Sequence, residues 1–148
     1  MRTIASVFGH PVHMMLVHFP MAFLIGGFGF DVAATSGIPV PPVVGATLVA
    51  VGLPTGVIAI LPGIVDLATT VRRLGGRAVG RALRHAVLAF AALAAFGAAS
   101  RQRSDLASIA SSPVLLLELL GVALLTPSAL LGGALVLDDK VGVRETGA

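Results

Sequence analysis

Histidine is the residue type in this chain with the widest chemistry, and three of its four copies stand close together. The stretch GHPVHMMLVHFP, residues 9–20, holds His10, His13 and His18, and His85 follows much later. Imidazole ligates metals through a neutral nitrogen and exchanges protons near neutral pH. These four side chains are therefore the first candidates for a functional site.

The first two histidines have the spacing of a partial metal site. His10 and His13 are three residues apart and share a face if the segment is helical, with Pro11 suited to the first helical position. Two imidazoles need further ligands to hold a divalent cation, and Asp66 or Asp139 would supply a carboxylate. In the alternative interpretation, His10 caps the helix and His13 lies among lipid headgroups.

His18 and His85 form the second candidate pair. His18 lies about two turns inside a predicted helix, and His85 opens a later one at similar depth. A polar side chain inside a bilayer is costly unless it faces the bundle interior and finds a partner. Histidines on facing helices can bracket a haem iron or a metal ion. The alternative is that each imidazole hydrogen-bonds a freed backbone carbonyl or reaches the headgroups.

Composition predicts the elements that position these histidines. Hydrophobic residues make up 56% of the 148 residues and charged residues only 11%, with a mean hydropathy of +0.99, whereas a soluble domain carries about 25% charged residues. The chain has no cysteine, which excludes disulfides and iron–sulfur ligation by its own side chains. Its net charge of +3 comes from arginines beside apolar runs, which indicates topology signals rather than nucleic-acid binding.

Four apolar stretches approach the length of about 20 residues that a membrane-spanning helix needs. They cover residues 14–35, 43–66, 83–100 and 113–137. We predict an all-α integral membrane four-helix bundle that forms a single domain over residues 1–148. The third stretch is short, and it gains length if Arg81 and Arg84 snorkel toward the headgroups. Small residues four apart, such as Gly52 and Gly56, indicate close helix contacts.

The basic residues predict the orientation of the bundle. Eight of the ten lysines and arginines fall on the side shared by both termini and the linker between the second and third spans. They are Arg2, Arg72, Arg73, Arg77, Arg81, Arg84, Lys140 and Arg144. Only Arg101 and Arg103 fall on the other side, so the positive-inside rule places both termini in the cytoplasm. The first apolar run is too long for a cleaved signal peptide, and histidines and Pro20 interrupt its start.

Antiparallel spans sort the polar side chains by membrane face. All four histidines, together with Asp66, Asp138 and Asp139, fall at the cytoplasmic face, whereas Asp31 and Glu118 fall toward the opposite one. Asp31 is expected to pair with one of the two arginines that follow the third span. Glu118 is either a second pairing partner or, with Asp31, part of a proton relay.

Three segments carry a family resemblance. They are GHPVHMMLVHFPMAFLIGGFGFD at 9–31, ILPGIVD at 60–66 and LLGGALVLDDKVGV at 130–143. They are similar to the opening, middle and closing motifs of a bacterial membrane-protein family known as domain of unknown function 2231. The resemblance implies a four-span fold, and because some relatives carry a Rieske-type iron–sulfur domain it also implies electron transfer. All four histidines and Asp66 match polar positions of the family pattern.

The chain departs from the family pattern in both terminal motifs. Met14 stands where members often have a proline. Ala134, Leu137 and Asp139 stand where the closing motif usually has Glu, Tyr and His. If that closing histidine is a ligand in relatives, Asp139 is a weaker substitute toward haem iron and an acceptable one toward a harder cation.

The leading functional prediction is a redox carrier rather than an enzyme, since no phosphate loop, nucleophile elbow or zinc-protease motif is present. His18 and His85 are the predicted ligands of a b-type haem or a divalent metal ion. His10, His13 and Asp66 surround them or form a separate cation site.

Two other functions stay open at this point. One is a proton or cation carrier that uses Asp31, Glu118 and the histidines, and the other is a structural membrane subunit without a cofactor. Under each of these functions we expect the chain to contact the lipid bilayer and to bind either a second copy of itself or a redox protein. We expect no binding of nucleic acid. The expected location is the bacterial inner membrane, with several passes.

Overall fold

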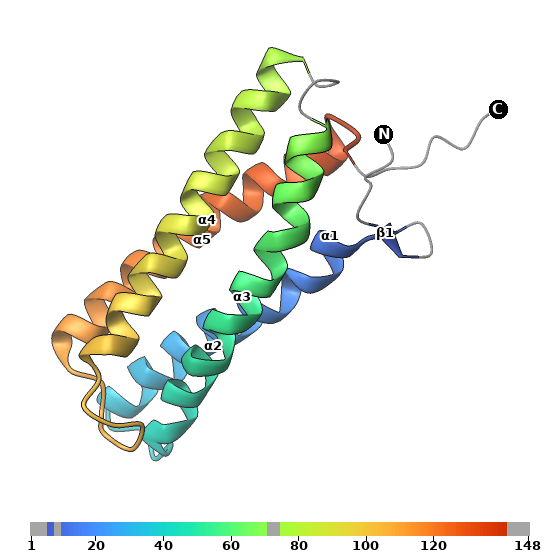
Figure 1. Cartoon of the computed structure of the whole chain (residues 1–148). Helices are drawn as coiled ribbons and strands as arrows, with labels where there is room; N and C mark the ends of the chain where they lie inside the picture. The colour runs from blue at the N-terminus through green and yellow to red at the C-terminus, as the bar shows by residue number, and fades with distance from the viewer. Residues whose placement is uncertain (1–5, 8–9, 71–74, 142–148) are drawn as a thin grey trace.

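Helices make up nearly all of the structure, a computed structural model that describes residues 6–7, 10–70 and 75–141. Two short strands, β1 (Ser6–Val7) and β2 (His10–Pro11), pair antiparallel before the first helix. The helices are α1 (Val12–Leu16), α2 (His18–Thr35), α3 (Pro42–Thr70), α4 (Gly76–Gln102) and α5 (Ser112–Leu137) (Figure 1). The side chains of residues 6, 7, 10 and 70 lie outside the description.

The first span consists of two helices. Only Val17 separates α1 from α2. Pro20 lies three residues later, and because a proline has no backbone N–H it cannot donate the helix hydrogen bond to the carbonyl of Leu16. The break between α1 and α2 therefore lies in the turn from which Pro20 removes a backbone hydrogen bond.

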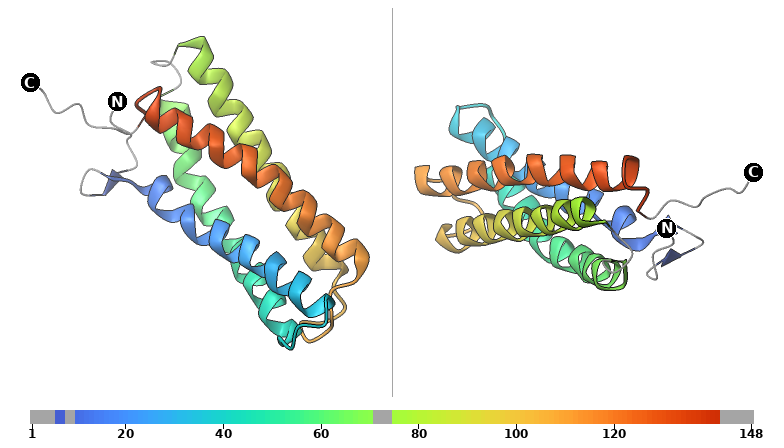
Figure 2. Two further views of the ribbon diagram at one scale, coloured as in Figure 1. Left: turned by 180° about the vertical axis from the view of Figure 1, so that it is seen from behind. Right: turned by 90° about the horizontal axis from the view of Figure 1, so that it is seen from above.

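The helices form two hairpins that pack together along their length. The first hairpin is α1, α2 and α3, the second is α4 and α5, and contacts are more extensive within each hairpin than between them. Figure 2 shows the same pairing from behind and from above. At one end of the bundle, here called the His end, α1 and α4 begin and α3 and α5 finish (Figure 1). The opposite end is here called the Arg103 end.

The surface of the bundle is suited to lipid. All four spans are long and apolar enough to cross a membrane, and large side chains such as Val87, Leu116 and Leu130 are more than three-fifths exposed. This confirms the prediction of an all-α membrane four-helix bundle. The helix α4 begins at Gly76, earlier than the span expected from residue 83, because its first two turns carry arginines that extend it beyond the purely apolar stretch.

Small residues bring the helices of the first hairpin into close contact. A Cβ atom added at Gly27 of α2 would lie 2.7 Å from Val49 Cγ2 and 3.0 Å from the carbonyl oxygen of Gly45, both on α3. Between the two hairpins, a cluster of buried apolar side chains forms the centre of the bundle. Its members are Leu24, Val49, Ala92, Phe96 and Leu125.

We expect Gly45→Ala to destabilise the bundle by about 1–3 kcal/mol, the usual cost of inserting a methyl group into a close-packed site. The added Cβ would lie 2.6 Å from Asp31 Cγ and 2.9 Å from the carbonyl oxygen of Gly27. Thermal unfolding followed by circular dichroism in mild detergent measures the effect. Gly29→Ala is the matched control, because a Cβ there meets nothing within 4 Å. Equal melting temperatures for the two variants would contradict this packing.

Candidate functional site

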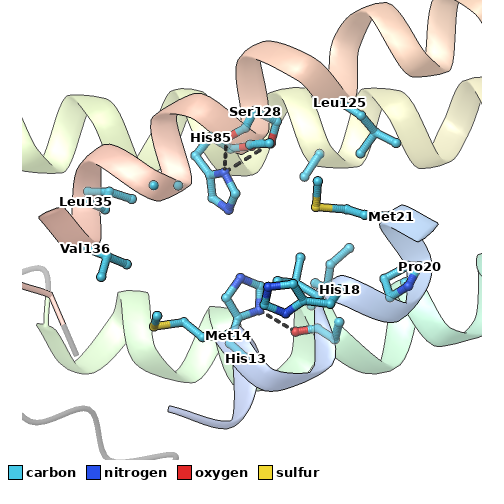
Figure 3. Close-up of a pocket in the computed structure, with 18 of the residues that line it drawn as sticks. His13, Met14, His18, Pro20, Met21, His85, Leu125, Ser128, Leu135 and Val136 are labelled. Atoms are coloured by element: carbon cyan, nitrogen blue, oxygen red, sulfur yellow. Dashed lines mark hydrogen bonds between the residues drawn. The ribbon is translucent and has the colours of Figure 1, made fainter. Parts of the chain in front are cut away.

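A cavity of about 410 Å³ opens between the two hairpins at the His end. Its walls are mainly apolar, with side chains such as Met14, Met21 and Leu125. Among the polar residues, His13 and His18 lie on the wall of the first hairpin and His85 on the wall of the second (Figure 3). The fold thus brings three of the four histidines to one cavity.

The ring of His13 is held by the helix α3. Its Nδ1 lies 2.7 Å from the backbone carbonyl oxygen of Ala59. One turn further along α3 is Gly63, where an added Cβ would lie 2.8 Å from His13 Nδ1 and 3.0 Å from Cε1. The glycine therefore leaves the space into which the imidazole fits.

The ring of His85 is held in the same way by the helix α5. Its Nδ1 lies 2.8 Å from the carbonyl oxygen of Ser128 and 3.1 Å from Ser128 Oγ. The hydroxyl group of Ser128 in turn donates to the carbonyl oxygen of His85, at 3.0 Å. Gly132 again lies one turn beyond the acceptor, and a Cβ there would be 3.0 Å from His85 Cε1.

These hydrogen bonds determine which nitrogen of each ring carries the proton. A carbonyl oxygen only accepts, so Nδ1 must be the donor in both histidines. In the neutral imidazole this leaves Nε2 with a free lone pair, the arrangement usual for a histidine that ligates a metal. The centroids of the His13 and His85 rings are 6.2 Å apart, with an interplanar angle of 79°. The two rings therefore meet edge to face, from opposite hairpins.

The other residues expected at this site have different positions. His18 lines the cavity but is exposed, and it is His13 that makes the ring contact with His85. Asp66 also lines the cavity. The side chain of His10 lies outside the described residues. Within the described part of the chain, no group of three or more His, Asp or Glu side chains is arranged to hold a metal ion.

Asp139 joins a salt bridge at the C-terminal end of α5. Arg81 Nη1 donates to Asp139 Oδ2 at 2.8 Å and to Asp138 Oδ2 at 3.1 Å. The same guanidinium nitrogen lies 3.3 Å from the carbonyl oxygen of Ala134, in the last turn of α5. Arg81 thereby ties α4 to the C-terminal end of α5, where a positive charge is favourable.

Asp31 and Glu118 lie far from the histidines, at the Arg103 end. Arg103 donates to Asp31 Oδ2 and, at 3.3 Å, to Glu118 Oε1. Both carboxyl side chains are almost completely buried. Of the two arginines offered by the sequence, the structure thus places Arg103 against Asp31. It also brings Glu118 into the same cluster.

Sequence reasoning missed the groups that hold the rings. The carbonyl oxygens of Ala59 and Ser128 have no signature in the sequence, because every residue carries a carbonyl. The glycines that accommodate the rings, Gly63 and Gly132, are visible as small residues inside the ILPGIVD and LLGGALVLDD motifs. Their spacing to a histidine in another helix becomes apparent only once the helices are packed.

Fold and composition together define a polytopic membrane protein with four spanning helices and an apolar, histidine-bearing cavity at one end. Comparison with known families agrees: the chain belongs to the family described as predicted membrane protein (DUF2231), whose profile matches residues 9–145. Searches of the curated proteins and of the solved structures each find no match.

We expect ¹⁵N NMR of histidine-labelled protein in detergent to show two imidazoles protonated at Nδ1 and not at Nε2. The physical reason is that His13 and His85 each donate from Nδ1 to a backbone carbonyl oxygen. The variants His13→Gln and His85→Gln assign the two signals. Spectra in which both rings carry the proton on Nε2 would contradict the geometry.

Two glycine variants test the fit of the His85 ring separately. Gly132→Ala should shift the ¹⁵N signals of His85, because the added methyl group lies 3.0 Å from Cε1 and 3.2 Å from Nδ1. Gly133→Ala is the control, since a Cβ there meets nothing within 4 Å and should leave those signals unchanged. An unchanged spectrum in both variants would mean that the ring does not occupy this position.

Proposed function

We propose that this protein is a redox carrier of the bacterial inner membrane, in which His13 and His85 would hold a b-type haem. The observation that carries the proposal is the pair of imidazoles that meet edge to face from opposite hairpins, each held at Nδ1 by a backbone carbonyl oxygen. The His end faces the cytoplasm in this proposal, following the distribution of arginines. A redox protein or a second copy would exchange electrons at that face.

The donor set favours haem over a metal ion bound by side chains alone. Protein-bound metal ions need about three or four side-chain ligands. Among the described residues, only two imidazoles are in ring contact here. A haem iron needs only axial ligands from the protein because the porphyrin supplies the others. The ring centroids of His13 and His85 are 6.2 Å apart, so a single bound group would contact both rings.

The cavity suits a flat, mainly apolar group. Its volume of about 410 Å³ falls within the range of about 300–1,000 Å³ usual for cofactor pockets. Gly63 and Gly132 have no side chain. The His13 ring can therefore lie close against α3 and the His85 ring close against α5, and no side chain at either glycine fills the cavity. Bound haem would supply reversible one-electron transfer.

The chain's own residues would orient and tune the ligands. The bonds from Nδ1 to the carbonyl oxygens of Ala59 and Ser128 fix the ring orientation and make Nε2 a stronger donor. The apolar walls lower the local dielectric and so influence the reduction potential. His13 takes the role first expected of His18, because His13 is the residue in ring contact with His85.

The proton or cation carrier is less well supported by the arrangement. A relay that joins Asp31 and Glu118 to the histidines would have to pass the central apolar cluster. Its buried members on α2, α4 and α5, namely Leu24, Phe96 and Leu125, come between the two polar ends along their helices. We therefore treat the two ends as separate sites.

A haem titration of protein purified in mild detergent tests the proposal. Wild type should develop a Soret band with one haem per chain. His13→Ala and His85→Ala should each weaken haem binding by at least about tenfold, since losing an outer-shell partner alone costs about 10–100-fold. His18→Ala is the matched control and should keep the band. No Soret band in wild type would refute the proposal, and loss with His18→Ala but not His13→Ala would refute this choice of ligands.

A further inference from the structure

Three ionisable side chains from both hairpins meet inside the bundle at the Arg103 end. Asp31 comes from α2, Arg103 from the C-terminal end of α4 and Glu118 from the second turn of α5. Their side chains are 0%, 5% and 1% exposed, respectively. This group, here called the Arg103 cluster, is separate from the histidine cavity, and its chemistry does not depend on haem binding.

The hydrogen bonds of the Arg103 cluster leave two carboxyl oxygens without a partner. Arg103 Nη2 donates to Asp31 Oδ2 and, at 3.3 Å, to Glu118 Oε1, while Nη1 donates to the carbonyl oxygen of Ser108 at 3.3 Å. Asp31 Oδ1 and Glu118 Oε2 are buried and make no hydrogen bond within the described structure. Two buried acceptors without a donor are energetically costly. One added hydrogen on either oxygen would supply the missing donor.

The charges of the Arg103 cluster also indicate that it holds an additional proton. A guanidinium group stays protonated in proteins and contributes one positive charge. Two ionised carboxylates would contribute two negative charges, which leaves one buried negative charge uncompensated. Two carboxyl groups that share a buried site do not both ionise readily, and one of them retains its proton.

We propose that the Arg103 cluster is a proton-binding site in which Glu118 is held as the neutral carboxylic acid and Asp31 as the carboxylate. Binding adds one proton to the Glu118 carboxylate and requires no other reactant. The cluster then has one positive and one negative charge and is neutral overall. Asp31 and Arg103 are the ionisable groups that the described structure records against Glu118.

The geometry assigns the proton to Glu118 rather than to Asp31. The hydrogen bond from Arg103 to Glu118 Oε1 is long, at 3.3 Å, so a negative charge on Glu118 is poorly compensated and is better placed on Asp31. A hydrogen on Glu118 Oε2 turns one of the two unpartnered acceptors into a donor, and Asp31 Oδ1 is the acceptor that lacks one. One proton thereby satisfies both atoms.

Packing keeps Asp31 in this position. Gly45 of α3 lies against its carboxyl group, so closely that an added Cβ would be 2.6 Å from Asp31 Cγ. The carboxyl group therefore has little space to turn toward another partner. This also keeps the site small, which favours a proton over a hydrated metal cation.

Infrared spectroscopy of the full chain in detergent at neutral pH tests the proposal directly. An un-ionised carboxylic acid gives a carbonyl stretching band that carboxylates lack, and wild type should show this band. Glu118→Gln, which imitates the neutral acid in shape, should remove the band while keeping the helical circular dichroism of wild type. Asp105→Asn is the control, since Asp105 is an exposed acid in the same loop as Ser108, and the band should remain.

Isotope labelling gives a second measurement that needs no substitution. Only Glu118 and Glu145 are glutamates in this chain, so ¹³C-carboxyl glutamate should shift the band and ¹³C-carboxyl aspartate should not. Absence of the band in wild type would overturn the proposal, and dependence of stability on sodium would then indicate a bound cation. A band that persists in Glu118→Gln or shifts with labelled aspartate would equally overturn it, because the proton would be on Asp31.

Discussion

Close approach at glycine is the constraint on which the rest of this structure depends. In lipid, an apolar side chain gains little by exchanging lipid for another helix, so spanning helices associate through contacts that small residues permit. A Cβ at Gly121 would lie 2.5 Å from Phe96, the largest fully buried side chain of the core. Gly63 and Gly132 provide the same kind of space for the imidazoles of His13 and His85. Glycine therefore permits the close helix contacts of the bundle and also provides the space for the rings of the candidate site.

The histidine and carboxyl side chains of this apolar bundle contact partners without breaking a helix, although Asp31 Oδ1 and Glu118 Oε2 make no hydrogen bond within the described structure. A backbone carbonyl has two lone pairs, so a helical carbonyl can accept an imidazole N–H in addition to its own helix bond. Both histidines use this second acceptor position, on Ala59 and Ser128. Asp31 and Glu118 instead share one guanidinium group. The central cluster around Phe96 contains no polar member among the described residues, which keeps the two polar ends distinct.

The four spans and the sorting of polar residues to two ends could be predicted from the sequence, because both follow from hydropathy and chain direction. The identity of the histidine beside His85 could not. Placing His18 against His85 assumed a helical phase that the sequence does not determine. In the structure His18 is exposed, and the ring beside His85 is that of His13. The partner of Asp31 depended on the path of the loop after α4, which sequence does not determine. Most of the fold was therefore predictable, and the contacts of the site were not.

Both polar ends of the bundle lie between the two hairpins. Each histidine is anchored within its own hairpin, His13 to α3 and His85 to α5, so neither anchor determines the distance between the rings. That distance depends on how the hairpins dock. At the Arg103 end, Asp31 of the first hairpin joins Arg103 and Glu118 of the second, and this contact ties the hairpins together. The ion pairs of the Arg103 cluster hold the hairpins together at one end, and the cavity lies between the same two hairpins at the other.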